Sequence, residues 1–326
     1  MNILYITSSG QDNLEDAYLH GLRSVFGAGC VDYPKKDVMY RNFSARAPEE
    51  MYGRLFTIWR TLEDIPVDRT DIDARVKAGY FDKIIFGSIH RTPDFFRRFQ
   101  PYLDPKKTIL LDGEDLNSIL LSARSYPYFK RELQPKASYY YNYKLVPKFL
   151  YNRGTFHRNV LPITFAIPKE KITPGITRAD KTRLFPSHIV DHELAEHPAL
   201  RDTPSTGHVF NRESEYYANI QASRFGITMR RNGWDCLRHY EIPANGAVIC
   251  FRDLAAKFPN NAPLGLDATN CVIYSSADEL LRKIDAISDV EYDRLLKAGY
   301  DWVGEQTTEI KALDMLRRAE ELVKGA

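Results

Sequence analysis

The sequence lacks the marks of several large classes of protein. No apolar run approaches the roughly 20 residues that cross a bilayer, and the N-terminus has neither the basic region nor the long apolar core of a signal peptide. The four cysteines show no CxxC spacing, so we expect reduced thiols in a cytoplasmic protein. With 45 basic and 43 acidic residues, the net charge of +2 argues against a dedicated nucleic-acid binder.

Two short motifs for cofactors and metals are also missing. The first predicted strand, residues 3–7, is not followed by GxGxxG, which removes the usual support for a nicotinamide enzyme. His192 and His197 are five residues apart, whereas the zincin motif needs a spacing of four to place both ligands on one helix face. The histidine-rich stretch therefore predicts no zinc site.

What is present describes a globular α/β protein of ordinary composition, with 44% hydrophobic and 27% charged residues. Short apolar runs alternate with amphipathic stretches, which predicts doubly wound parallel sheets. Strands are predicted at residues 83–89, 108–111, 184–190, 225–229, 247–251 and 271–274. Helices are predicted at residues 13–26, 49–62, 191–200, 214–222 and 308–323. A chain of 326 residues suits two domains, and the extended, proline-punctuated residues 160–168 are the expected crossing between them.

The segment from residue 225 to residue 254 carries the most information about function. A predicted strand leads into a basic turn that contains Arg230, Arg231 and Gly233, and a helix is expected from Trp234 or Asp235. Sheets of this kind bind ligands where strands end and helices begin. Orphan amides and the dipole at a helix start favour phosphate. Further along the helix, Arg238 and Glu241 are three residues apart and can act on one ligand.

This segment resembles the signature of GT-B glycosyltransferases of group 1, most closely the branch related to the spore maturation protein CgeB. The matching positions are Gly233-Trp234, Arg238, Glu241, Ala244 and Gly246. Similar matches occur at residues 20–23, 161–163, 276–280 and 298–300. Many retaining members carry a second acid eight residues before the helix glutamate. Position 233 is glycine here, so a retaining outcome does not carry over.

The resemblance implies a GT-B fold of two Rossmann-like domains facing a cleft. Residues 1–165 would form the acceptor-side domain and residues 166–326 the donor-binding domain, with the last helix, about 307–326, returning to the first. The glutamate would hold the ribose of a nucleotide-sugar, and basic residues would hold its diphosphate without an obligatory metal or other cofactor. The implied donor-binding residues are Arg230, Arg231, Gly233, Trp234, Arg238, Glu241 and Gly246.

Polar residues follow two predicted strands of the first domain, where active-site groups of parallel sheets belong. His90 follows one strand, and Asp112, Glu114 and Asp115 follow the next. His90, Glu114 and Asp115 are the candidates for the catalytic base, although a single histidine after a strand is more often structural. Ser9, Gly10, Asp12 and Asp112 are expected on the acceptor side. Residues 126–151, rich in tyrosine, are either an acceptor-facing surface or a mixture of core and partly buried side chains.

The sequence therefore predicts a glycosyltransferase that moves a sugar from a nucleoside-diphosphate-sugar to a hydroxyl acceptor. A polysaccharide or cell-envelope glycan is the expected acceptor, and a modified DNA base remains an alternative. Two other functions stay open on the same fold. One is a nucleotide-sugar hydrolase or epimerase, which needs no acceptor; the other is a degenerate binding module without catalysis.

Overall fold

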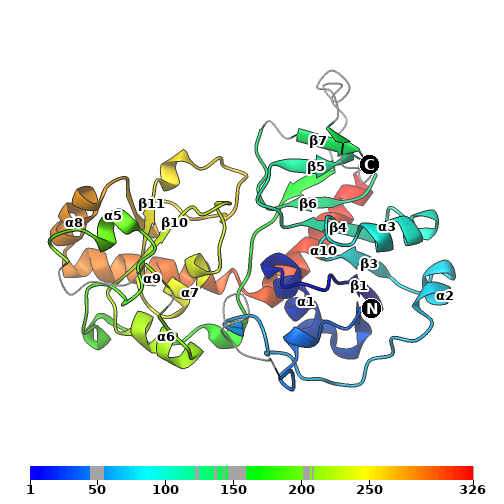
Figure 1. The fold of residues 1–326 in the computed structure, drawn as a ribbon, viewed down its shortest axis with the longest axis horizontal. Coiled ribbons are helices and arrows are strands. Elements are labelled where there is room, and N and C mark those ends of the chain that lie inside the picture. Colours follow the sequence, from blue (N-terminus) through cyan, green and yellow to red (C-terminus); the bar gives the residue numbers. More distant parts are fainter. Residues whose placement is uncertain are drawn as a thin grey trace.

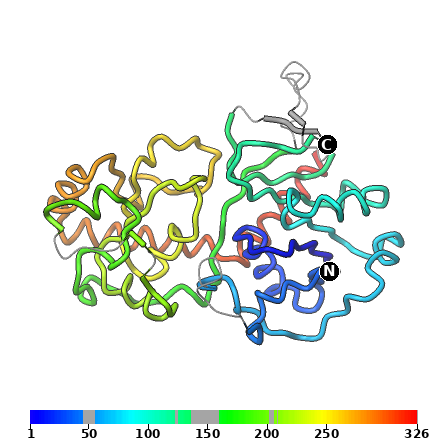
Figure 2. Tube along the Cα trace, viewed as in Figure 1, coloured from blue at the N-terminus to red at the C-terminus, as the bar shows by residue number. Residues whose placement is uncertain are grey.

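The computed structural model describes residues 1–44, 55–121, 125–135, 138–141, 144–145, 159–200, 206–207 and 209–325. Two α/β units lie side by side, and the chain crosses between them twice, after residue 162 and again between residues 304 and 308 (Figure 1; Figure 2). Residues 136–137, 142–143 and 146–151 of the tyrosine-rich stretch, and residues 49–54 of the predicted helix at 49–62, lie outside the described parts.

The first unit contains a six-stranded parallel sheet in the order β2-β1-β3-β4-β6-β9. Its strands are β1 (Ile3–Ile6), β2 (Cys30–Tyr33), β3 (Lys83–Phe86), β4 (Thr108–Asp112), β6 (Tyr128–Lys130) and β9 (Val160–Pro162). The helices α1 (Asn13–Phe26), α2 (Ile72–Lys77) and α3 (Pro93–Phe99) accompany it. The strands are apolar runs because both faces of a parallel sheet are covered. The order reverses between β1 and β3, so the crevice for ligands is expected at their carboxyl ends.

The second unit contains the parallel sheet β10-β11-β12, formed by Phe225–Met229, Val248–Arg252 and Cys271–Tyr274. Its helices are α5 (His192–Ala195), α6 (Glu213–Gln221), α7 (Arg238–Ala244), α8 (Ala277–Ala286) and α9 (Asp289–Gly304). Ser276 caps α8 and Ser288 caps α9, because each side chain accepts a hydrogen bond from the backbone amide three residues later. A small third sheet joins β5 (Ser118–Leu120), β7 (Ser138–Tyr141) and β8 (Lys144–Leu145).

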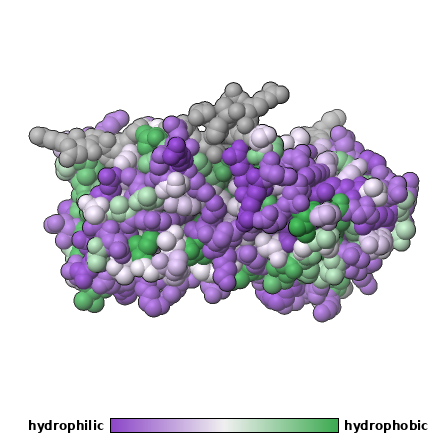
Figure 3. All heavy atoms as spheres, turned by 90° about the horizontal axis from the view of Figure 1, so that it is seen from below, coloured by the Kyte–Doolittle hydropathy of each residue, from purple (hydrophilic) through white to green (hydrophobic). Residues whose placement is uncertain are grey.

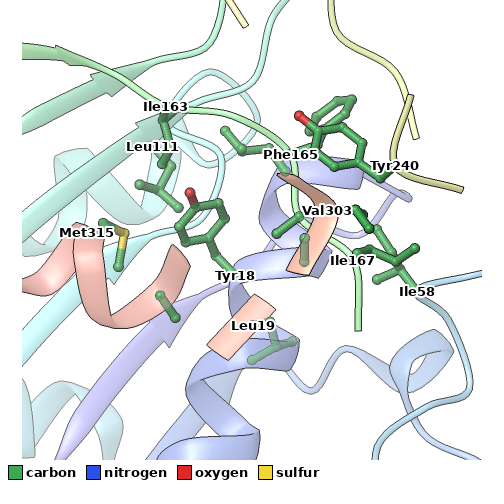
Figure 4. Packing of buried hydrophobic residues seen from close by; sticks show 14 of the residues in the cluster. Tyr18, Leu19, Ile58, Leu111, Ile163, Phe165, Ile167, Tyr240, Val303 and Met315 are labelled. Atoms are coloured by element: carbon green, nitrogen blue, oxygen red, sulfur yellow. The ribbon is translucent and has the colours of Figure 1, made fainter. Parts of the chain in front are cut away.

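The last helix, α10 (Thr308–Lys324), leaves α9 and lies along α1 of the first unit (Figure 1). The two helices approach closely at Gly21, where a Cβ would lie 2.0 Å from the carbonyl oxygen of Thr308. One apolar cluster runs through this junction. Figure 4 shows Tyr18 and Met315 near Leu111, with Phe165 and Tyr240 beside them. The crossing segment is therefore buried between the two units rather than exposed as a linker.

Several predicted elements are wrong, each for a local reason. Residues 55–62 form turns instead of helix, and Leu55, Thr57 and Arg60 adopt left-handed backbone angles. Residues 184–190 contain Pro186 and form no strand, because proline cannot donate to the ladder. The helix predicted at residues 191–200 is only α5 and ends before Pro198. The helix expected from Trp234 or Asp235 begins at Arg238.

In the view of Figure 3 hydrophilic residues predominate, and the hydrophobic ones form small separate patches. Within the described residues, no helix has both the length and the apolar character needed to cross a bilayer. All four cysteines are free thiols.

Candidate active site

A cavity of about 530 Å³ lies at the carboxyl edge of the second sheet. The last residues of all three strands, Met229, Arg252 and Tyr274, line it. Parallel sheets bind ligands at this edge, where the strands end and polar groups from several segments converge. The cavity therefore lies where the sequence places a ligand. Arg230, Trp234, Asp253 and Lys283 also contribute to its walls.

The two arginines of the basic turn have different surroundings. The Arg230 guanidinium lies over the Trp234 ring, 5.3 Å from its centroid, and both residues line the cavity. Arg231 is exposed and outside the lining. Its backbone amide donates to the Gly233 carbonyl at 3.0 Å and closes the turn. The sequence offers no reason to prefer either arginine as a phosphate ligand, whereas in the structure only Arg230 lines the cavity.

Arg252 is a cavity residue that the sequence reasoning missed. Its guanidinium donates to Asp191 Oδ1 at 2.8 Å and to Glu193 Oε2 at 2.5 Å. The Tyr274 hydroxyl donates to the other Asp191 oxygen at 2.8 Å, so the network fixes the Arg252 side chain. The position of Arg252 at the end of a predicted strand was the signal that could have found it.

The turn before α7 contacts the first domain. Glu132 Oε1 accepts from the amides of Trp234 at 2.7 Å and Asp235 at 3.3 Å, and Glu132 Oε2 accepts from Asn261 Nδ2 at 3.0 Å. A Cβ on Gly233 would lie 2.6 Å from this carboxylate, so only glycine fits here. Burial raises the pKa of Glu132, although Arg131 and the two amides oppose the shift. The amides that the sequence assigned to phosphate therefore hold a protein carboxylate.

Arg131, only 2% exposed, anchors the same junction. Its guanidinium donates to the Gly113 carbonyl at 2.9 and 3.0 Å, to the Asp235 carbonyl at 3.1 Å, and to Asp115. The predicted catalytic Asp115 is thus ion-paired, and it faces the Gly233 turn. Neither Arg131 nor Glu132 was among the predicted residues. Both directly follow a buried strand, the pattern that had selected Asp112 and Asp115.

Glu241, the predicted ribose ligand, is 7% exposed and does not line the cavity. Its Oε1 accepts from the Thr57 hydroxyl and its Oε2 accepts from the Tyr216 hydroxyl at 2.7 Å. Burial raises the pKa of Glu241, and the two hydrogen bonds and the charge of Arg238 oppose that rise. Arg238 begins α7, one turn before Glu241. The structure thus keeps these two predicted donor residues together on one helix.

Gly246 has a backbone role. Its φ is +68°, which is the left-handed conformation that ends a helix, and a Cβ would lie 2.6 Å from Ile176. It follows α7 at the end opposite Arg238 and is not part of the cavity at the carboxyl edge.

His90 and Asp112 meet at the carboxyl edge of the first sheet. His90 Nε2 lies 3.0 Å from Asp112 Oδ2, and the Tyr128 hydroxyl donates to the same oxygen at 2.5 Å. The other oxygen accepts from Lys130 Nζ at 2.8 Å and from the Glu114 amide at 3.1 Å. Burial acts to raise the pKa of Asp112, but Lys130 and His90 outweigh it and hold that pKa well below the usual range. Because an ionised carboxylate only accepts, His90 Nε2 carries a proton, and in the neutral ring Nδ1 has the lone pair.

The Arg91 side chain lies between two other predicted residues of the first domain, Asp12 and Glu114. Its guanidinium lies 3.4 Å from Asp12 Oδ2 and 3.3 Å from Glu114 Oε1, and it donates to the Gln11 carbonyl at 2.9 Å. Asp12 also caps α1 by accepting from the amides of Leu14 and Glu15. Ser9 and Gly10 lie in the exposed part of this loop. The predicted acceptor-side residues and Glu114 therefore share one edge of the sheet.

The described residues contain no group of three or more His, Cys, Asp or Glu side chains placed to hold a metal ion. In the histidine-rich stretch, His197 Nε2 lies 3.0 Å from Asp278 Oδ1.

No protein-family model matches the sequence, and no curated protein matches it either. Solved structures do match over the full length. A glycosyltransferase from Rickettsia africae has a TM-score of 0.55 at 11% identity, over 100% of this chain and 99% of that one. Anabaena HepE in complex with UDP and glucose has a TM-score of 0.53 at 10% identity, over 100% of both chains. An alpha-glucosyltransferase in complex with UDP and a 13-mer DNA containing an HMU base has a TM-score of 0.50 at 10% identity, over 99% of both. The fold is therefore GT-B.

Proposed function

We propose that this protein is a glycosyltransferase that uses a nucleoside-diphosphate-sugar donor. Residues 166–326 would bind the donor and residues 1–165 would present a hydroxyl acceptor, in the cytoplasm. The cavity at the ends of β10, β11 and β12 carries the proposal, because it combines an aromatic wall, Trp234, with fixed cations. Structures of the same fold contain UDP, which supports UDP as the first nucleotide to test.

The donor diphosphate would be held by cationic side chains. Arg230 and Arg252 line the cavity, and Arg238 lies at the start of α7. Guanidinium groups bind phosphate oxygens through paired hydrogen bonds, and the leaving diphosphate gains negative charge as the sugar departs. These residues can stabilise that charge without a metal.

His90 is the group best placed to act as a base. Its Nδ1 can accept the proton of an acceptor hydroxyl while Asp112 holds the opposite nitrogen. The acceptor oxygen then bonds to the anomeric carbon, and the bond from that carbon to the diphosphate breaks. Asp115 is less suited, because it is engaged by Arg131. The acceptor we favour is a glycan of a polysaccharide or cell envelope.

Thermal unfolding with UDP, GDP, dTDP, ADP and CMP and their sugar conjugates tests donor binding. A nucleotide at 100 times its Kd should stabilise the fold by about 2.7 kcal/mol and raise the Tm. Wild type is compared with Arg238→Ala and Glu241→Ala, and with the exposed Arg97→Ala as a control. A rise that Arg97→Ala keeps and the other two lose supports the donor site.

The alternatives give different outcomes in a nucleotide-release assay. A transferase releases nucleotide faster when an acceptor is added, so mixed oligosaccharides and hydroxymethylated DNA are supplied in separate reactions. A hydrolase or epimerase processes the donor equally well in buffer alone. A binding module without catalysis releases nothing, and the absence of both binding and release would overturn the proposal.

A further inference from the structure

A short segment of the first domain covers the Glu241 carboxylate. The Thr57 hydroxyl donates to Glu241 Oε1, and the Tyr216 hydroxyl fills Oε2 at 2.7 Å. The neighbouring Phe56 ring stacks on Tyr216, with centroids 6.1 Å apart and an interplanar angle of 22°. Glu241 remains only 7% exposed, so no outside hydroxyl reaches it while the segment is in place.

The segment is tied to α6 as well as to α7. The Thr57 amide donates to Glu213 Oε1, and the Tyr217 hydroxyl lies 2.8 Å from Thr57 Oγ1. Thr57 gives its single hydroxyl proton to the carboxylate, so Tyr217 must be the donor in that pair. Lys171 Nζ bonds the other Glu213 oxygen at 2.6 Å. The contacts form one chain from Tyr217 through Thr57 to Glu241.

The backbone of the segment is strained. Thr57 has φ of +70°, and Leu55 and Arg60 have +60° and +57°. Left-handed angles are uncommon for any residue other than glycine and are outliers for a β-branched one. Such conformations persist only where surrounding contacts hold them. The hydrogen bonds to Glu213, Tyr217 and Glu241 are those contacts, so breaking them also frees the segment to relax.

We propose that Thr57 sets the affinity of the donor site by competing with a ligand hydroxyl for Glu241. This rests on the proposed function, in which Glu241 binds the ribose diol of the nucleotide. Binding then requires the Phe56–Thr57 segment to leave α6 and α7, and the apparent Kd is the intrinsic Kd divided by the fraction of molecules in which it has left. Weakening the cover raises that fraction and tightens binding.

The test compares Thr57→Ala, which loses the hydroxyl, with Thr57→Ser, which keeps it. Thr61→Ala is the matched control, because the Thr61 hydroxyl donates to the Ile58 carbonyl within the same segment, at 2.6 Å. Tyr217→Phe is a second way to weaken the cover if Thr57→Ala folds poorly. Calorimetric titration with UDP should give a Kd about tenfold lower for Thr57→Ala, the size expected for one hydrogen bond to a charged group. Thr57→Ser and Thr61→Ala should match wild type.

Hydrogen exchange gives a readout that needs no ligand. Amides of α6 and α7 should exchange roughly tenfold faster in Thr57→Ala than in Thr61→Ala, because the cover opens more often. Unchanged or weaker UDP binding by Thr57→Ala overturns the inference and leaves the donor proposal intact. If neither wild type nor any variant binds UDP, the proposed donor site is wrong. The hydrogen-exchange comparison then decides by itself whether Thr57 covers Glu241. Equal exchange in the two variants then overturns it.

Discussion

The carboxylate of Glu132 and the backbone amide of Trp234 are joined by a hydrogen bond of 2.7 Å, which ties the end of β6 to the turn before α7. The same oxygen also accepts from the Asp235 amide. This carboxylate satisfies the amides of two buried residues in the turn that leads to the helix. It also explains why α7 begins at Arg238, since the residues before it are held by the first domain.

We predict that Gly233→Ala destabilises the protein by about 1–3 kcal/mol, the usual effect of forcing a methyl group into a packed site. The added Cβ would lie 2.6 Å from both Asp115 Oδ1 and Glu132 Oε1 and 2.9 Å from Arg131 Nη1. Gly233 is not one of the left-handed glycines, so the change reports the contact rather than backbone strain. Urea unfolding of the variant and wild type measures the difference.

Gly304→Ala, in the last turn of α9, is the matched control. A Cβ there meets no atom within 4 Å, and alanine is the better helix former by about 1 kcal/mol. Its stability should equal or exceed that of wild type. Equal stability of Gly233→Ala and Gly304→Ala would show that the turn has room and that the Glu132 contact is loose.

The arginines of the basic turn give a second prediction. Arg230→Ala should raise the Kd for UDP about tenfold, because a charge-assisted hydrogen bond to phosphate is lost. Arg231→Ala should stay within about twofold of wild type, because Arg231 is exposed and outside the cavity lining. Calorimetric titration separates the two variants, which have the same change in net charge. The reverse order of effects would move the donor site away from the cavity.

The sequence predicts the sheets better than the helices that join the domains. Residues 225–229 and 271–274 were identified as strands because buried parallel strands are continuous apolar runs. The last helix spans the predicted residues, but two of its large apolar side chains, Ile310 and Leu313, are 41% and 46% exposed. The helix instead places Ala312 at the close approach to Gly21 of α1, and it also buries Met315 and Leu316. A pattern of large apolar residues cannot reveal the contact between Ala312 and Gly21.

The candidate site shows a similar division. His90 and Asp112 were each selected because they follow strands, and pairing of β3 with β4 brings them together. The contact of Glu132 with Trp234 joins residues 102 positions apart in different domains, so no local pattern predicts it. The cover over Glu241 depends on residues 55–62 forming turns, where the sequence predicted a helix.

We predict that the free energy of unfolding falls in acid, because His239 is buried as a neutral ring. Its Nε2 donates to the Trp234 carbonyl at 2.8 Å, its Nδ1 accepts from Thr228 at 2.9 Å, and its ring stacks on Phe251. Burial lowers the pKa of His239 to about 4, against about 6.5 in the unfolded chain. Between these values the unfolded state binds the proton and the folded state does not. Stability is therefore complete above pH 6.5 and falls by about 3 kcal/mol as the pH drops to 4.

Urea unfolding between pH 7.5 and 4.5 measures how the free energy of unfolding changes with pH. Wild type is compared with His239→Gln, whose side-chain amide can still donate and accept. Other buried acids also contribute to the pH dependence, so the difference between the two proteins isolates His239. The exposed His192→Gln is the control and should keep the wild-type slope. Parallel curves for wild type and His239→Gln would mean that His239 takes up a proton equally in both states.

His90→Gln tests the base directly, in an acceptor-dependent nucleotide-release assay. Loss of a general base should lower kcat about 10²–10⁴-fold, whereas the Kd for UDP should stay within about twofold, because His90 lies on the first sheet and the cavity on the second. If His90 has only a structural role, His90→Gln should instead lower the Tm, the affinity for UDP and the rate together. His197→Gln, which removes a histidine–aspartate pair outside the cavity lining, should leave rate and affinity unchanged. An unchanged kcat in His90→Gln would transfer the base role to Glu114 or Asp115, and Asp115 would then have to leave Arg131 before it could accept a proton.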